Sequence, residues 1–204
     1  MDWLKEFKEY KSKIGDRISI YSLVAKKYNI KRALYPGSHI DISPSMVIPE
    51  VTYVDNFKGA IKFFEDIRDI EKYVNRNKEY QEMCNIIFIG TDYNNELNIN
   101  KVDIIISQYA GFVGQATKRY LKEDGILLCN DSHGDATLAY LDEDYILVGV
   151  IDRHNNISTK QLEKYFVFKN GRKIDENKVR STMKGPKYEI QATNYIFKLK
   201  TQPD

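Results

Sequence analysis

The 204-residue sequence contains only two cysteines, Cys84 and Cys129, and both lie in or beside short apolar runs. Two widely separated cysteines form neither a disulfide framework nor the paired thiolates of a zinc site. The sequence therefore predicts two buried free thiols.

Long apolar runs and an excess of one charge are also missing. No run reaches the roughly 18 residues that a membrane-spanning helix needs, and the N-terminus carries Asp2 and Glu6 where a signal peptide would be basic and then apolar. The chain has 31 basic and 29 acidic side chains, a net charge of +2, so no global field attracts nucleic acid or an anionic membrane. We expect a cytoplasmic protein without a membrane partner.

The apolar residues that are present predict two helices followed by a series of strands. From Asp2 to Tyr28 they recur at helical spacing, and Gly15-Asp16 predicts a break between two helices. Short runs rich in β-branched or aromatic residues follow, each ended by Gly, Asp or Asn, and these are typical of strands. The runs span residues 32–35, 51–54, 85–89, 102–106, 126–129, 145–150 and 195–199.

Two stretches between the strands predict crossover helices. Residues 56–80 carry an apolar stripe, and Asn56 is the predicted N-cap of this helix. Gly111 to Leu121 offer a second helix, with a turn at residues 122–125. Strands that are apolar on both faces and joined by helices are typical of a doubly wound, mostly parallel sheet. The predicted fold class is α/β.

The domain organisation predicted from these patterns is simple. Residues 1–30 form an N-terminal helical extension, and residues 31–204 form one compact domain, because no linker-like stretch interrupts them. The polar residues 152–187 predict a solvated excursion with a helical start at Ser158. Their lysines and arginines form either a phosphate-facing patch or an ordinary solvated surface.

Residues that follow the first three strands are candidate ligand contacts, because ligands of parallel sheets bind at the carboxyl ends of the strands. Gly37 allows a close approach to the backbone, and Ser38 offers a hydroxyl. Asp55 can accept hydrogen bonds from a ribose diol, or it can cap a helix. Residues 90–94 suit an adenine ring and its amine, or they form a tight polar turn.

Polar residues also follow the next two strands. Ser107-Gln108-Tyr109 ends one of them, and Asp131, His133 and Asp135 follow the other. A neutral imidazole between carboxylates is a usable metal ligand or proton acceptor. The alternative is a hydrogen-bonded loop in which Asp131 orients His133.

The strand-end motifs together resemble a known family. The order Leu34-Tyr35-Pro36-Gly37-Ser38, then Val51 to Asp55, Phe88 to Asp92 and Asp103 to Ser107 is similar to the class I, Rossmann-like S-adenosylmethionine-dependent methyltransferases. The similarity runs from about Lys31 to Val150 and more loosely to the end. It implies S-adenosylmethionine as the cofactor and a late antiparallel strand, residues 195–199, beside residues 145–150.

The resemblance also implies roles for individual residues. Gly37 would approach the methionine part of the cofactor, Asp55 its ribose and Asp92 its adenine. The full set of implied cofactor contacts is Tyr35, Pro36, Gly37, Ser38, Asp55, Asn56, Asp92, Tyr93, Ser107, Gln108 and Tyr109.

The first loop departs from the family pattern. It has one glycine instead of several, and residues 40–50 are too short and too rich in proline, at Pro44 and Pro49, for a full crossover helix. Either a short turn begun by Ser43-Pro44 replaces the helix, or the carboxylate of the cofactor is held differently.

The leading hypothesis is a methyltransferase for an unidentified acceptor, with a small molecule favoured over nucleic acid. Asp131 or His133 would serve as the base, and Gln108 and Tyr109 would line the acceptor side. One alternative is a regulatory module that binds S-adenosylmethionine or a nucleoside without transfer. Another is a metal-dependent enzyme that uses the Asp131-His133-Asp135 loop.

Overall fold

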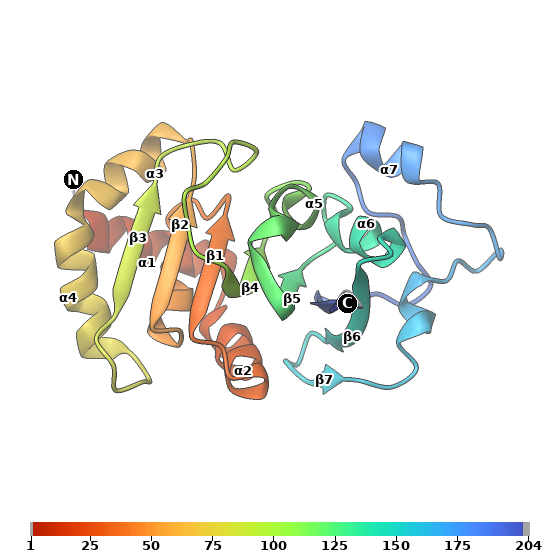
Figure 1. The fold of residues 1–204 in the computed structure, drawn as a ribbon, viewed down its shortest axis with the longest axis horizontal. Coiled ribbons are helices and arrows are strands. Elements are labelled where there is room, and N and C mark those ends of the chain that lie inside the picture. The colour runs from red at the N-terminus through yellow and green to blue at the C-terminus, as the bar shows by residue number, and fades with distance from the viewer. Residues whose placement is uncertain (1, 202–204) are drawn as a thin grey trace. The chain divides into compact units, whose positions relative to one another are not determined.

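The computed structural model describes residues 2–201, and the chain divides after Leu97 into two compact units (Figure 1). Unit 1 comprises residues 1–97 and unit 2 comprises residues 98–204. Both combine strands with helices, which confirms the predicted α/β class. The division into a 1–30 extension and a 31–204 domain stays a prediction.

Unit 1 is built on three parallel strands in the order β3-β2-β1. The register aligns Tyr35, Tyr53 and Phe88, so three aromatic side chains lie in one row across the strands. The elements are α1 (Trp3–Ile14), α2 (Ile18–Tyr28), β1 (Arg32–Pro36), η1 (Ser43–Met46), β2 (Glu50–Val54), α3 (Lys58–Phe63), η2 (Phe64–Asp66), α4 (Ile67–Asn77) and β3 (Asn85–Ile89).

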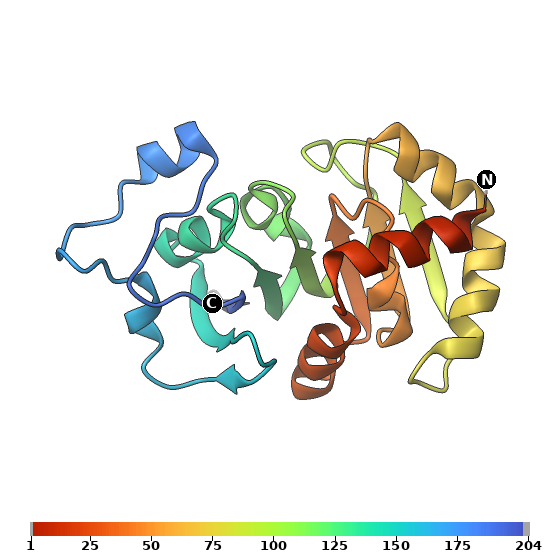
Figure 2. The same cartoon turned by 180° about the vertical axis from the view of Figure 1, so that it is seen from behind.

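The two predicted N-terminal helices are present, and the break between them lies where the sequence placed it. Gly15 ends α1 with a φ of +80°, a conformation that favours glycine. Trp3 of α1 packs edge-on against Phe63 and Tyr73, with ring centroids 6.2 and 5.6 Å apart. Figure 2 shows α1 crossing the face of the unit 1 strands, and Phe7 is its buried side chain.

The connection from β1 to β2 is the short turn that the sequence predicted as one of two alternatives. Pro44 lies in the first turn of η1, a four-residue 3₁₀ helix. Ser45 fixes the turn from inside, because its N–H donates to the Tyr53 hydroxyl at 3.2 Å and its own hydroxyl lies 2.6 Å from the same oxygen. A full crossover helix is replaced by one buried turn.

The crossover after β2 is helical, as predicted, but its start differs. Phe57, not Asn56, occupies the N-cap position of α3, and no side chain caps it in the usual way. Asp55 instead accepts a hydrogen bond from the Phe57 N–H at 2.8 Å. The predicted Asn56 cap is therefore wrong: a carboxylate one residue earlier already satisfies a backbone donor at the helix start.

Unit 2 contains five strands in the order β4-β5-β8-β6-β7. β4 and β5 are parallel, and the other pairs are antiparallel. The predicted late strand therefore lies beside β6, as expected. The elements are β4 (Val102–Ser107), α5 (Val113–Thr117), η3 (Lys118–Tyr120), β5 (Leu121–Cys129), α6 (Asp135–Leu141), β6 (Tyr145–Ile151), β7 (Ile157–Ser158), η4 (Leu162–Phe166), α7 (Glu176–Thr182) and β8 (Asn194–Leu199).

Residues 122–125, predicted as a turn, lie inside β5. The register pairs Val102 with Leu121 and then Ile104 with Ile126, so these four residues bulge opposite Asp103. Asp-Gly is a turn signal in sequence, but pairing with β4 on both sides absorbs it as a β-bulge. The helix predicted from Gly111 to Leu121 is present as α5 followed by η3, which together span residues 113–120.

The polar segment of unit 2 is only partly the predicted excursion. Most of its side chains are exposed, but Phe166, Phe168 and Val179 are buried. Ser158 ends the short strand β7 instead of starting a helix, and the first helical turn begins at Leu162. The buried side chains hold the segment against the rest of the unit.

Two predictions from missing features can be compared directly with the structure. Cys84 and Cys129 are buried free cysteines, as predicted. None of the helices within residues 2–201 has the length and apolarity required to cross a membrane.

Candidate functional site

A cavity of unit 1 lies at the carboxyl ends of β1, β2 and β3 and encloses about 120 Å³. The strands are parallel, so the loops that follow them meet at one edge. Five of the implied cofactor contacts come together here, with Thr91 and Asn94 from the candidate residues 90–94. The lining residues are Gly37, Asp55, Asn56, Thr91, Asp92, Tyr93 and Asn94.

Asp55 connects two loops beside this cavity. One of its carboxylate oxygens accepts the His39 N–H at 2.7 Å, and the other accepts the Phe57 N–H at 2.8 Å. Each carboxylate oxygen has two lone pairs, so both retain acceptor capacity. The two sequence interpretations of Asp55, helix start and ligand contact, are therefore compatible.

Asp92 lies in the turn after β3. Its Oδ1 accepts hydrogen bonds from the backbone N–H and the side-chain amide of Asn94, at 2.9 and 2.7 Å. Its Oδ2 accepts a longer bond of 3.4 Å from the Asn56 amide. The polar turn that the sequence allowed is present, and the same carboxylate lines the cavity.

Three other predicted contacts have side chains that lie below the loop. Tyr35 and Ser38 are each 1% exposed, and Pro36 is buried. The Tyr35 hydroxyl belongs to a buried cluster, in which it donates to Asp41 and accepts from Arg17, both at 3.2 Å. These side chains support the loop instead of lining the cavity.

His39 is a residue that the predicted site did not include. Its imidazole lies between the rings of Tyr10 and Phe57, with centroids 4.8 and 5.4 Å away, and burial lowers its pKa. Its Nδ1 is buried and has no hydrogen-bond partner among residues 2–201. The sequence signal for His39 was its position in the loop after the first strand. In the structure its backbone has a φ of +49° and its N–H donates to Asp55.

Unit 2 holds the other predicted residues, beginning with a buried carboxyl group. Asp135 is 2% exposed and accepts hydrogen bonds from the Ser107 hydroxyl at 2.6 Å and the Gly114 N–H at 3.0 Å. Burial raises the pKa of Asp135 to about 7. Ser107 is therefore bound to a neighbouring side chain inside the unit.

A chain of amides follows β4. The Gln108 amide donates to Asn194 at 2.6 Å and accepts from Asn130 at 3.1 Å, and Asn130 in turn accepts from the Ser132 hydroxyl at 2.7 Å. Gln108 is 8% exposed, whereas Tyr109 is 61% exposed and has a φ of +59°. A positive φ is rare for a bulky residue, so the neighbouring loop structure holds Tyr109 outward.

Asp131 and His133 lie in the loop before α6. Both oxygens of Asp131 accept hydrogen bonds from Thr137, one from its N–H at 2.8 Å and one from its hydroxyl at 2.7 Å. Burial raises the pKa of Asp131 to about 6. His133 Nδ1 lies 3.0 Å from the Ser132 hydroxyl. Within residues 2–201, no three His, Cys, Asp or Glu side chains are grouped as metal ligands.

Solved structures of methyltransferases match this chain at low sequence identity. An S-adenosylmethionine-dependent methyltransferase from Clostridium acetobutylicum is 10% identical, with a TM-score of 0.54 over 97% of this chain and 99% of that chain. The plantazolicin methyltransferase BpumL in complex with SAH is 10% identical, with a TM-score of 0.52 over 91% and 82%. A methyltransferase from Geobacter sulfurreducens is 11% identical, with a TM-score of 0.50 over 74% and 84%.

The chain has a class I methyltransferase fold. The resemblance inferred from the strand-end motifs is therefore confirmed at the level of the fold, and so is the Rossmann-like fold class. No protein-family model and no curated protein sequence matches the chain.

The cavity of this methyltransferase fold suits the nucleoside part of S-adenosylmethionine. Asp55 and Asp92 offer carboxylate acceptors to hydroxyl and amine donors, and Tyr93 adds an aromatic side chain. At about 120 Å³ the cavity is smaller than the roughly 300 Å³ at which pockets for whole ligands begin, so it would enclose only part of the cofactor.

The loop after β1 fits less well with the methionine part. The Gly37 N–H donates to the Val54 carbonyl at 2.7 Å, and the His39 N–H donates to Asp55. Two backbone donors that could meet a carboxylate are thus already used. The short turn after β1 therefore leaves neither of these two N–H groups for a carboxylate of a ligand.

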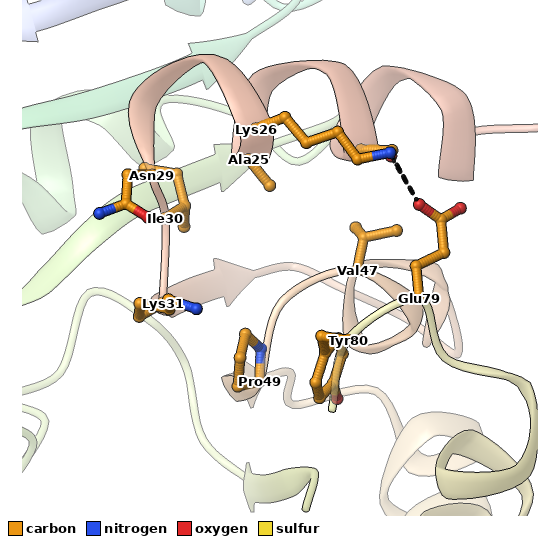
Figure 3. A pocket seen from close by; sticks show the side chains of 10 residues that line it. Ala25, Lys26, Asn29, Ile30, Lys31, Val47, Pro49, Glu79 and Tyr80 are labelled. Carbon is orange, nitrogen blue, oxygen red and sulfur yellow. Dashed lines mark hydrogen bonds and ion pairs between the residues drawn. The ribbon is translucent and has the colours of Figure 1, made fainter. Parts of the chain in front are cut away.

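A second pocket of unit 1 lies at the other edge of the strands, where Lys31 and Pro49 directly precede β1 and β2. It encloses about 180 Å³, and Figure 3 shows Lys26 reaching toward Glu79 across it. Glu79 accepts from the Ser22 hydroxyl at 2.8 Å and from Lys26 at 3.2 Å, and these bonds lower its pKa. None of the predicted site residues lines this pocket.

Proposed function

We propose that this protein binds S-adenosylmethionine and transfers its methyl group to an acceptor. The observation that supports this most strongly is the convergence of Gly37, Asp55 and Asp92 on one cavity, in a chain with a class I methyltransferase fold. BpumL, one of the proteins with a similar fold, is in complex with SAH.

In this proposal the residues of unit 1 bind and orient the nucleoside. Asp55 accepts hydrogen bonds from the ribose hydroxyls, and Asp92 accepts one from the adenine amine. When bound, S-adenosylmethionine supplies a methyl group already activated by a positively charged sulfur, so catalysis consists mainly of aligning the acceptor. Ser107, Gln108 and Tyr109 remain predicted contacts from unit 2.

The binding step can be tested by isothermal titration with S-adenosylmethionine and SAH. We expect micromolar affinity for the wild type and an affinity lower by about 10- to 100-fold in Asp55→Asn, because a hydrogen bond to a charged group contributes roughly 1.5–3 kcal/mol. Asparagine keeps an acceptor for only one of the two N–H groups that Asp55 binds, so the circular dichroism spectrum of the variant is compared with that of the wild type.

Asp16→Asn is the matched control for this experiment. Asp16 accepts the N–H of Ile18 at the start of α2, in the same geometry in which Asp55 accepts the N–H of Phe57, but it does not line the cavity. The control should bind like the wild type. Equal losses in both variants, or no binding by the wild type, would refute the proposed cofactor site.

The transfer step is assigned to Asp131 and His133 when the acceptor must lose a proton. A pKa raised to about 6 leaves Asp131 ionised at neutral pH yet more basic than an ordinary aspartate, which suits a general base. We expect His133→Ala to lower methyl transfer by about 100-fold and to leave cofactor affinity unchanged. The rate of methyl transfer is measured with radiolabelled cofactor, separately for the small-molecule fraction and the nucleic-acid fraction of a cell extract. A loss of cofactor affinity in His133→Ala would place His133 at the cofactor instead.

A second candidate function is binding of S-adenosylmethionine without transfer. The single glycine of the first loop and the engaged N–H groups of Gly37 and His39 favour it, because a reduced loop holds the cofactor less tightly. This candidate predicts a measurable heat of binding for both ligands and no labelled product with either extract fraction.

A further inference from the structure

The positive charge of the chain is concentrated in one segment of unit 2, residues 160–188, which we call the basic segment. It contains nine basic and three acidic residues, a net charge of +6, whereas the rest of the chain carries −4. The near-neutral total of +2 therefore averages over a strongly uneven distribution. The basic residues are Lys160, Lys164, Lys169, Arg172, Lys173, Lys178, Arg180, Lys184 and Lys187.

Most of these cations lack a carboxylate partner. Arg180 pairs with Glu176 at 2.7 Å, but within residues 2–201 no acidic group lies within 4.0 Å of the other eight. All nine except Lys164 are exposed. Like charges gathered without partners repel one another, so this surface is electrostatically complementary to an external anion.

The basic segment is anchored, so its cations are displayed on a defined surface. Phe166 stacks on Tyr140 of α6, with ring centroids 4.0 Å apart and an interplanar angle of 3°. The Tyr188 hydroxyl lies 2.9 Å from that of Thr137, also in α6. Gly185 packs so closely on the backbone of Asp131 that an added Cβ would overlap it. In Figure 1 the segment forms the blue loop that carries α7.

Three of the exposed cations line a groove of about 410 Å³. Its two sides are held together by a hydrogen bond of 2.9 Å from the Glu189 N–H to the Val167 carbonyl. Arg172 lies over the ring of Phe168, 4.2 Å from its centroid, which leaves the guanidinium at the groove. The groove is lined by Phe168, Lys169, Asn170, Arg172, Lys187, Tyr188 and Glu189.

We propose that the basic segment binds the phosphate backbone of a single-stranded nucleic acid. Cations spaced along a segment match phosphates spaced along a strand, and a groove lined by Lys169, Arg172 and Lys187 suits an extended chain better than the flat surface of a bilayer. Binding at this surface needs no methyl transfer and no cofactor, so the inference stands independently of the proposed function.

The test is fluorescence anisotropy with a labelled oligouridylate of about 20 nucleotides, titrated with full-length protein at several salt concentrations. We expect micromolar affinity at low salt. Replacing Lys169, Arg172 and Lys187 together by glutamate should weaken binding at least tenfold. It should also reduce the slope of log affinity against log salt concentration by about 2, since each phosphate contact on a single strand contributes about 0.7 to that slope. Isothermal titration with S-adenosylmethionine should be unchanged in this variant.

The control variant carries Lys8→Glu, Lys13→Glu and Lys62→Glu, which change the net charge equally at exposed positions of unit 1. It should keep wild-type affinity for the oligonucleotide, within about twofold. If the protein binds an oligothymidylate as tightly as the oligouridylate, the result supports recognition of the backbone alone. Weaker binding of the oligothymidylate supports a contribution from the ribose hydroxyls. Equal losses in both variants, no binding at low salt, or binding to phosphatidylserine vesicles in place of the oligonucleotides would overturn the proposal.

Discussion

Replacing Arg17 by methionine should destabilise unit 1 by about 3–5 kcal/mol, the range observed when one partner of a buried ion pair is removed. Asp41 has no exposed surface, and its Oδ2 accepts hydrogen bonds from Arg17 and Tyr21, each at 3.2 Å. Arg17 is the positive charge that compensates this buried carboxylate. Without it, the carboxylate keeps only neutral donors, which do not replace the lost charge.

Trp3 makes this effect measurable, because it is the only tryptophan and packs within unit 1. Its fluorescence during urea unfolding reports the free energy of unfolding of unit 1. Arg68→Met, at an exposed arginine of α4, is the control and should change stability by less than about 0.5 kcal/mol. Adding Asp41→Asn to Arg17→Met should recover part of the loss, and a single-variant loss below about 1 kcal/mol would contradict the role assigned to Arg17.

Replacing Asp135 by asparagine should remove a large part of the pH dependence of unit 2. The pKa of Asp135 is about 7 in the folded protein, against an ordinary value of 3.8, because the carboxyl group is buried. Between pH 3.8 and pH 7 the folded state holds a proton that the unfolded state has lost. The free energy of unfolding therefore decreases as the pH rises from 3.8 to 7. Three pKa units correspond to about 4 kcal/mol.

The measurement is urea unfolding followed by circular dichroism from pH 4 to pH 8, with Trp3 fluorescence separating the transition of unit 1. The free energy of unfolding of Asp135→Asn, measured relative to that of the wild type, should increase by on the order of 4 kcal/mol as the pH rises across this range. Asp175→Asn is the control, because asparagine caps α7 as well as aspartate does. Parallel pH profiles for the wild type and Asp135→Asn would show that Asp135 does not titrate near neutrality.

The strands and the edge at which they carry polar residues were predictable from local patterns. A run such as residues 85–89 is recognisable because β-branched and aromatic side chains end at a glycine, and the same residues form β3. Parallel strands bring their carboxyl ends together, so the predicted parallel sheet was enough to group Gly37, Asp55 and Asp92. Whether they bind a cofactor stays a prediction.

Other features depended on contacts between residues far apart in sequence. The predicted turn at 122–125 carries the local signal of a turn, yet pairing with β4 makes it a bulge. Tyr35 follows the pattern of a ligand-side residue, but Arg17 and Asp41 bind its hydroxyl inside the core. Both differences arise because hydrogen bonds with distant partners outweigh local preference.

The sequence by itself determined the α/β class, most strand positions and the loops that carry candidate ligand contacts, because periodicity and turn residues act over a few neighbours. Tertiary structure alone decided which polar side chains line a cavity and which are buried in hydrogen bonds. It also decided that the polar residues 160–188 are an anchored surface, through Phe166 and Tyr188. Burial and hydrogen-bond partners depend on packing between distant segments, which composition and spacing do not encode.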